Sequence, residues 1–118
     1  MNLVIDVGNT LIKSAVFQGD NLIKKKIALK QDFLKNIDEV LQAHPKITHV
    51  LISSVVKSTT KWEQRLREKL HVINLHQDLP QLFTNRYSTP ATMGQDRIAL
   101  VSAAAKLYPE ENILVIDA

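Results

Sequence analysis

A short polar stretch near the N-terminus, Asp6-Val7-Gly8-Asn9-Thr10, combines residue types that suit phosphate binding. Gly8 lets the backbone pass close to phosphate oxygens, because it has no Cβ. Asn9 and Thr10 can donate hydrogen bonds, and Lys13 can place a positive charge on a β- or γ-phosphate. Asp6 would repel a bare phosphate, so its presence favours a bridging Mg2+ held through water. The stretch predicts a nucleoside triphosphate site, with an ordinary hairpin turn capped by Asp6 as the alternative.

A second polar group lies between Tyr87 and Arg97, where an irregular segment leads into a helical pattern. Gly94 permits a tight entry into the helix, and Asp96 and Arg97 fall in its first turn. The helix dipole favours an acid at this place but not an arginine. The arginine therefore indicates an anionic ligand gripped through two hydrogen bonds, and Asp96 could accept a proton from a hydroxyl nucleophile. A capping aspartate beside a surface arginine is the alternative.

The first polar stretch lies between two strand patterns, so strands must position it. Residues 2–5, 11–17 and 22–29 are apolar or alternating, and turn residues separate them. They predict a three-strand meander whose first turn carries the polar residues.

Helices and strands alternate after the meander. Asp32 is a plausible N-cap for a helix that Pro45 stops, with a core-facing stripe at i, i+3/i+4 and i+7 spacing made of Phe33, Leu34, Ile37, Val40 and Leu41. Residues 47–55 predict a strand buried on both faces. Ser58 or Thr59 can cap a second helix that runs to about Leu70, with Trp62 and Leu66 on its apolar stripe, and residues 72–75 predict a short strand.

The rest of the chain positions the second polar group. Residues 77–93 predict a long loop with one helical turn, followed by a helix over 95–107 and a last buried strand over 112–116. Asp117 then stands at the carboxyl end of that strand, where α/β sheets place ligands. The pattern predicts an α/β fold with a mixed sheet of three meander strands plus parallel strands, and helices on its faces.

Composition narrows the class of protein. The chain has 118 residues, 45% hydrophobic and 23% charged, which fits one globular domain with a real core. It has no cysteine, which excludes disulfides and thiolate metal sites. The N-terminus enters a strand directly, which argues against a signal peptide, and no apolar run approaches membrane-spanning length. We therefore expect a cytoplasmic protein without a membrane partner.

Basic residues gather in two places, Lys24-Lys25-Lys26 and the run from Lys57 to Lys69. Glu63 and Glu68 interrupt the second group, and no aromatic platform accompanies either. We interpret both groups as solvated faces rather than a nucleic-acid surface.

Taken together, the two polar groups resemble the type III pantothenate kinase family. The resemblance rests on Asp6-Val7-Gly8-Asn9-Thr10 with Lys13, on Tyr87-x-x-Pro90-x-x-Met93-Gly94-x-Asp96-Arg97, and on a strand that ends in Asp117. It covers the whole chain in order. Thr89 stands where the family commonly has asparagine, and Met93 where leucine is usual, two mild departures. The resemblance implies a ribonuclease H-like, actin-like ATPase domain.

The resemblance also implies roles for individual residues. The first phosphate loop for ATP would be Asp6, Val7, Gly8, Asn9, Thr10, Leu11, Ile12 and Lys13. Pantothenate would contact Tyr87, Gly94, Gln95, Asp96 and Arg97. Asp96 would be the general base, and Arg97 would hold the pantothenate carboxylate. Metal ligands would be Asp6 for Mg2+ and Asp117 for an activating monovalent cation, K+ or NH4+, in a homodimer.

The implied reaction is phosphorylation of pantothenate to 4'-phosphopantothenate, the first step of coenzyme A biosynthesis. The family continues after Ala118 with a second actin-like domain, so we expect residues 1–118 to form an N-terminal domain that is incomplete alone. Two alternatives stay open: a transcription accessory factor of the same family, and a non-catalytic nucleotide-binding module.

Overall fold

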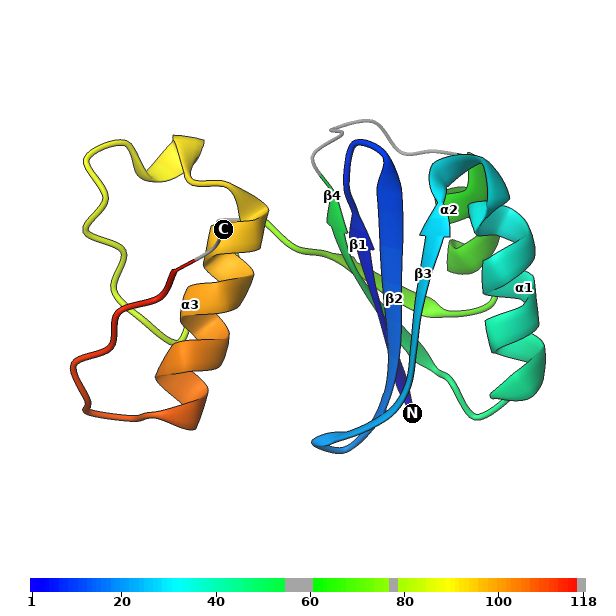
Figure 1. Ribbon diagram of the computed structural model, residues 1–118, viewed down its shortest axis with the longest axis horizontal. Coiled ribbons are helices and arrows are strands. Elements are labelled where there is room, and N and C mark those ends of the chain that lie inside the picture. Colours follow the sequence, from blue (N-terminus) through cyan, green and yellow to red (C-terminus); the bar gives the residue numbers. More distant parts are fainter. Residues whose placement is uncertain (55–60, 77–78, 117–118) are drawn as a thin grey trace. The chain divides into compact units, whose positions relative to one another are not determined.

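The computed structural model describes residues 1–54, 61–76 and 79–116. It divides into two compact units, Met1–Asn74 and Leu75–Ala118, and each is described by itself. Figure 1 shows a twisted sheet with helices in the first unit and an α-helix with surrounding loops in the second. The chain order of elements is β1 (Asn2–Val7), β2 (Leu11–Gln18), β3 (Asn21–Leu29), η1 (Lys30–Asp32), α1 (Phe33–Ala43), β4 (His49–Ser54), α2 (Lys61–Arg67), β5 (His71–Asn74), η2 (Pro90–Thr92) and α3 (Gln95–Leu107).

The first unit is built on a five-stranded sheet in the order β3-β2-β1-β4-β5. The meander β1–β2–β3 is antiparallel, whereas β4 and β5 run parallel to β1. This mixed arrangement confirms the predicted α/β fold class, with a meander on one side and parallel strands on the other. It places β1, which carries Asp6, at the centre of the sheet.

Buried and less buried side chains alternate along the strands, and the buried ones form the core. Leu3 and Ile5 on β1, and Val50 and Ile52 on β4, are fully buried on the face that α1 and α2 cover. Both helices lie on this side of the sheet in Figure 1. Phe33 and Trp62 join them through an edge-to-face contact with ring centroids 4.9 Å apart. Leu51, on the opposite face of β4, is only half-buried, so this strand is not buried on both faces as predicted.

Helix α1 agrees with its predicted bounds, but two details differ. Asp32 occupies the N-cap position without a side-chain capping bond, because η1 already gives it helical backbone angles. Its carbonyl instead accepts a hydrogen bond from Asn36 Nδ2 at 2.8 Å. Leu34 is 44% exposed rather than part of the buried stripe, which consists of Phe33, Ile37 and Val40 with the half-buried Leu41 packed against the same core.

Helix α2 ends at Arg67, and residues 68–70 form a tight turn in which the Lys69 N–H bonds the Leu66 carbonyl. The expected caps Ser58 and Thr59 lie outside the described residues. Glu63, predicted to lie on a solvated face, is buried instead. Its carboxylate is satisfied there by Arg67 and Asn74, each with a nitrogen within 3 Å of Oε1.

The predicted last strand is wrong. Residues 112–116 have no regular secondary structure, and Leu114 and Ile116 are 84% and 79% exposed. A strand needs a neighbour for its backbone hydrogen bonds, and the described part of Leu75–Ala118 contains no other strand. The predicted helical turn in the preceding loop is confirmed as η2.

Candidate functional site

The β1–β2 turn holds the predicted phosphate-binding residues on the central hairpin of the sheet. The Gly8 N–H donates to the Leu11 carbonyl at 3.0 Å and closes the turn. A Cβ on Gly8 would lie 2.9 Å from that same carbonyl oxygen, so a larger residue would force the turn open. The position therefore requires glycine for a steric reason within the turn itself.

Side chains of this turn point to solvent rather than into the core. Asn9 and Thr10 are exposed, and neither side chain hydrogen-bonds another residue that the structure describes. The Thr10 carbonyl accepts the Lys30 N–H at 3.2 Å, which ties the turn to the end of β3. A well-anchored backbone that presents hydroxyl and amide donors fits a phosphate group.

Asp6 and Lys13 are brought together by the strand register. They are direct partners in the antiparallel pair, and Lys13 Nζ lies 4.0 Å from Asp6 Oδ2. Of the other predicted loop residues, Val7 and Ile12 are buried in the core, so they position the turn and do not touch a ligand. Leu11 is 43% exposed at the turn itself.

Sequence reasoning missed Ser53 near this group. Ser53 is the register partner of Asp6 on the parallel strand β4. Its hydroxyl therefore belongs to the same face and the same carboxyl end of the sheet, where α/β proteins bind ligands. The two serines that end β4, Ser53 and Ser54, were the available signal.

In the second unit, the loop before α3 is folded around η2. The Thr92 Oγ1 donates to the Thr89 carbonyl at 2.8 Å and lies 2.6 Å from Thr89 Oγ1. Asn85 supports both ends of the segment, because its Oδ1 accepts the Tyr87 N–H at 2.9 Å and its Nδ2 donates to Met93 Sδ at 3.4 Å. Asn85 was not predicted, although an asparagine two residues before Tyr87 is a turn signal.

The first turn of α3 carries Asp96 and Arg97, the residues predicted to act as general base and to bind an anionic ligand. Gly94 is the N-cap residue, and its carbonyl accepts the Ile98 N–H at 3.1 Å. A Cβ on Gly94 would collide with the Asp96 carboxylate, so glycine makes room for that side chain. Asp96 and Arg97 are both exposed in the first turn, and Tyr87 is 47% exposed. Ile98 anchors this turn by its complete burial.

The structure thus assembles each predicted group separately, Asp6 to Lys13 in Met1–Asn74 and Tyr87 to Arg97 in Leu75–Ala118. Asp117, predicted to bind a cation, lies outside the described residues. Among the described residues no cluster of three or more His, Cys, Asp or Glu could hold a metal.

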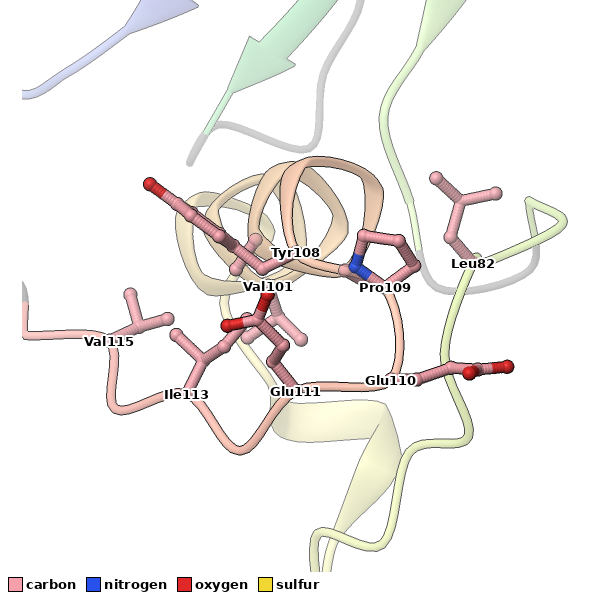
Figure 2. Close-up of a pocket in the computed structure, with 10 residues that line it drawn as sticks. Leu82, Val101, Tyr108, Pro109, Glu110, Glu111, Ile113 and Val115 are labelled. Atoms are coloured by element: carbon pink, nitrogen blue, oxygen red, sulfur yellow. The ribbon is translucent and has the colours of Figure 1, made fainter.

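A cavity of about 550 Å³ in the second unit lies apart from the predicted residues. Figure 2 shows it against α3, with Leu82 and Pro109 toward one end and Ile113 and Val115 toward the other. Its only charged lining residues are Glu110 and Glu111. An apolar cavity with an acidic rim does not suit an anionic substrate, so the start of α3 stays the better candidate.

Comparison with known proteins confirms the family resemblance seen in the sequence. A family model described as type III pantothenate kinase matches residues 2–118. A type III pantothenate kinase of Christiangramia forsetii is 44% identical over 118 residues, which is 100% of this chain and 49% of the relative. Those of Flavobacterium johnsoniae and Flavobacterium psychrophilum are 36% and 34% identical, with 100% of this chain and 48% and 49% of the relatives covered.

The chain spans about half the length of these curated relatives. No helix in the described part of the chain is long and apolar enough to cross a membrane. Because the family match extends over nearly every residue, the chain belongs to the type III pantothenate kinase family.

Proposed function

We propose that the polypeptide to which this chain corresponds transfers the γ-phosphate of ATP to pantothenate and forms 4'-phosphopantothenate, the first step of coenzyme A biosynthesis. The observation that carries the proposal is the family match over residues 2–118. The two sequence motifs on which the resemblance rests lie on exposed segments anchored by backbone hydrogen bonds, one on the β1–β2 hairpin and one at the start of α3, and this supports the proposal.

The proposed chemistry needs a base, a phosphate cradle and charge neutralisation. Asp96 takes the proton from the primary hydroxyl of pantothenate as the new O–P bond forms and the bond to ADP breaks. Arg97 pairs with the pantothenate carboxylate, and Tyr87, Gly94 and Gln95 line the same pocket.

Residues Asp6 to Lys13 hold the ATP phosphates in this proposal. The exposed donors of Asn9 and Thr10 and the exposed Lys13 ammonium support this assignment to a triphosphate. A bound Mg2+ would neutralise phosphate charge and contact Asp6 through water. We further propose a monovalent cation, K+ or NH4+, at Asp117, a homodimeric assembly and a cytoplasmic location.

We also propose that a second actin-like domain, after residue 118, completes the ATP site. The supporting observation is that the relatives are about twice as long as the chain. We expect residues 1–118 alone to be weak or inactive, since a phosphoryl transfer site depends on holding both substrates in line.

A chimera tests the function directly. Residues 1–118 are joined to the C-terminal half of the Christiangramia forsetii relative, and phosphopantothenate is measured by mass spectrometry with ATP, Mg2+, K+ and pantothenate. We expect product, and a loss of about a hundredfold or more in rate for Asp96→Asn. Asp38→Asn, an exposed aspartate on α1, is the control and should keep the rate.

Two outcomes would overturn the proposal. One is a folded chimera that forms no product while the relative's own full-length protein does. The other is an Asp96→Asn chimera as active as its control. In the first case, an effect of the protein on transcription would favour the accessory-factor alternative.

A further inference from the structure

Two histidines stand side by side on neighbouring parallel strands. His49 begins β4 and His71 begins β5, and the two residues are register partners. Their ring centroids lie 5.2 Å apart with an angle of 65° between the ring planes. Both side chains are exposed, so each ring can rotate about its own bonds without disturbing the core.

The spacing of the two rings suits a shared metal ion. Imidazole is a good ligand for Zn2+, Cu2+ and Ni2+. Two imidazoles on one tetrahedral Zn2+, with Zn–N distances of about 2.0–2.1 Å, have ring centres about 5 Å apart. The observed separation of the ring centres therefore matches that of two imidazoles on a common ion, and no movement of the strands is needed.

The neighbouring residue Thr48 can select the nitrogen that binds. Thr48 Oγ1 lies 2.9 Å from His49 Nδ1. When Nδ1–H donates to this hydroxyl, Nε2 carries the free lone pair that a metal requires, as in most metal-binding histidines. The strand starts are also held in place, because the Thr48 N–H bonds the Met1 carbonyl at 3.2 Å and the His71 N–H bonds the Thr48 carbonyl at 3.0 Å.

We propose that His49 and His71 form a two-histidine site for a divalent transition metal of the Cu2+, Ni2+ and Zn2+ group, with water completing the coordination. The site is distinct from the phosphate-binding turn. His49 pairs with Asn2 at the first residue of β1, whereas Asp6 lies near the other end of that strand. It needs neither nucleotide nor pantothenate, and it stands whether or not the proposed kinase function does.

Calorimetric titration of the tag-free 118-residue protein with Ni2+ and Zn2+ tests the proposal. We expect one equivalent to bind, and His49→Asn or His71→Asn to abolish that binding. Thr48→Val should weaken it roughly tenfold, as loss of an outer-shell partner does. His44→Asn, on a half-buried histidine at the end of α1, is the matched control and should bind normally. Circular dichroism establishes that each variant is folded.

Electron paramagnetic resonance of the Cu2+ complex keeps the test decisive if a variant fails to fold. The unsubstituted protein should show hyperfine coupling to two imidazole nitrogens, and Cu2+ should bind more tightly than Ni2+ or Zn2+. Coupling to one imidazole only, or to the terminal amine of Met1, would overturn the proposal. So would unchanged binding in the folded His49→Asn and His71→Asn variants.

Discussion

Lys13 lies directly opposite Asp6 on the central hairpin, with its Nζ 4.0 Å from the Asp6 carboxylate. The two side chains are 57% and 47% exposed, so water screens their attraction. A pair of this kind stabilises a fold by about 0–1 kcal/mol. The pair therefore contributes little to the stability of the sheet, and Lys13 stays available for the ligand role proposed above.

Replacing Lys13 by methionine should weaken ATP binding without unfolding the protein. In the active chimera we expect the KM for ATP to rise roughly tenfold, since a tenfold change corresponds to about 1.4 kcal/mol of lost charge interaction. The unfolding midpoint in urea should hardly move. Lys24→Met, on the exposed edge strand β3, is the charge-matched control, and an equal rise in KM for both variants would contradict the assignment.

Gly8 and Gly19 should respond differently to alanine. Gly8→Ala pushes a Cβ against the Leu11 carbonyl, so we expect about 1–3 kcal/mol of destabilisation together with weaker ATP binding. Gly19 has a φ of 60° and open space around it, so Gly19→Ala should cost only the left-handed backbone strain of about 1–2 kcal/mol. Urea unfolding and the KM for ATP distinguish them. Weakened ATP binding in Gly19→Ala would argue against a local role for Gly8.

Arg67 and Arg65, both on α2, should contribute very differently to the free energy of unfolding. Arg67 donates to the buried Glu63 carboxylate at 2.9 Å and to Asn74 Oδ1 at 2.8 Å. Arg67→Met leaves a buried acid short of a partner and should cost roughly 2 kcal/mol. Arg65 lies 3.7 Å from Asp38 at the surface, and Arg65→Met should cost less than about 0.5 kcal/mol. If urea unfolding gave the same loss of stability for both variants, the bonds between Arg67, Glu63 and Asn74 would contribute no more than an exposed ion pair.

The link between β3 and α1 should be visible in an acid titration. Lys26 Nζ donates to Glu39 Oε2 at 2.6 Å and, with its charge, holds the pKa of Glu39 below the ordinary value of 4.5. Because the folded-state pKa is lowered, the stabilisation is present above pH 4.5 and is lost as the pH falls through the folded value.

Lys26→Met should therefore raise the pKa of Glu39 and flatten the loss of stability below pH 4.5. Carboxyl carbon shifts of Glu39, followed by NMR during an acid titration, measure this directly. Lys24→Met serves again as the control. A Glu39 titration curve that is the same in both variants would exclude the Lys26 bond as its cause.

Much of the first unit could be predicted because its signals are local. Alternation at Leu3 and Ile5 marks one face of β1, and the spacing of Phe33 and Ile37 marks one face of α1. The turn at Gly8 and the helix start at Gly94 were predictable as well, since glycine is common at tight turns and helix entries; the binding roles of the residues beside them stay predictions.

What could not be predicted depends on partners distant in the sequence. The buried Glu63 carboxylate accepts a hydrogen bond from Asn74 Nδ2, which lies on the next strand. No sequence pattern near Glu63 indicates that this bond will form. Residues 112–116 have the composition of a strand, yet composition cannot supply the neighbour that a strand requires. The hydrogen bond from Asn85 Nδ2 to Met93 Sδ could not be predicted either, since no sequence pattern marks a methionine sulfur as an acceptor.

The position of β1 at the middle of the sheet also affects the order of folding during synthesis. Its antiparallel partner β2 follows at once, so the β1–β2 hairpin can close while the chain is still short. Its parallel partner β4 arrives only after α1, which leaves the other edge of β1 unpaired in the nascent protein. A chain stalled on the ribosome before residue 49 would thus expose the complete β1–β2 turn on an unfinished sheet, a target for chaperones rather than a working domain.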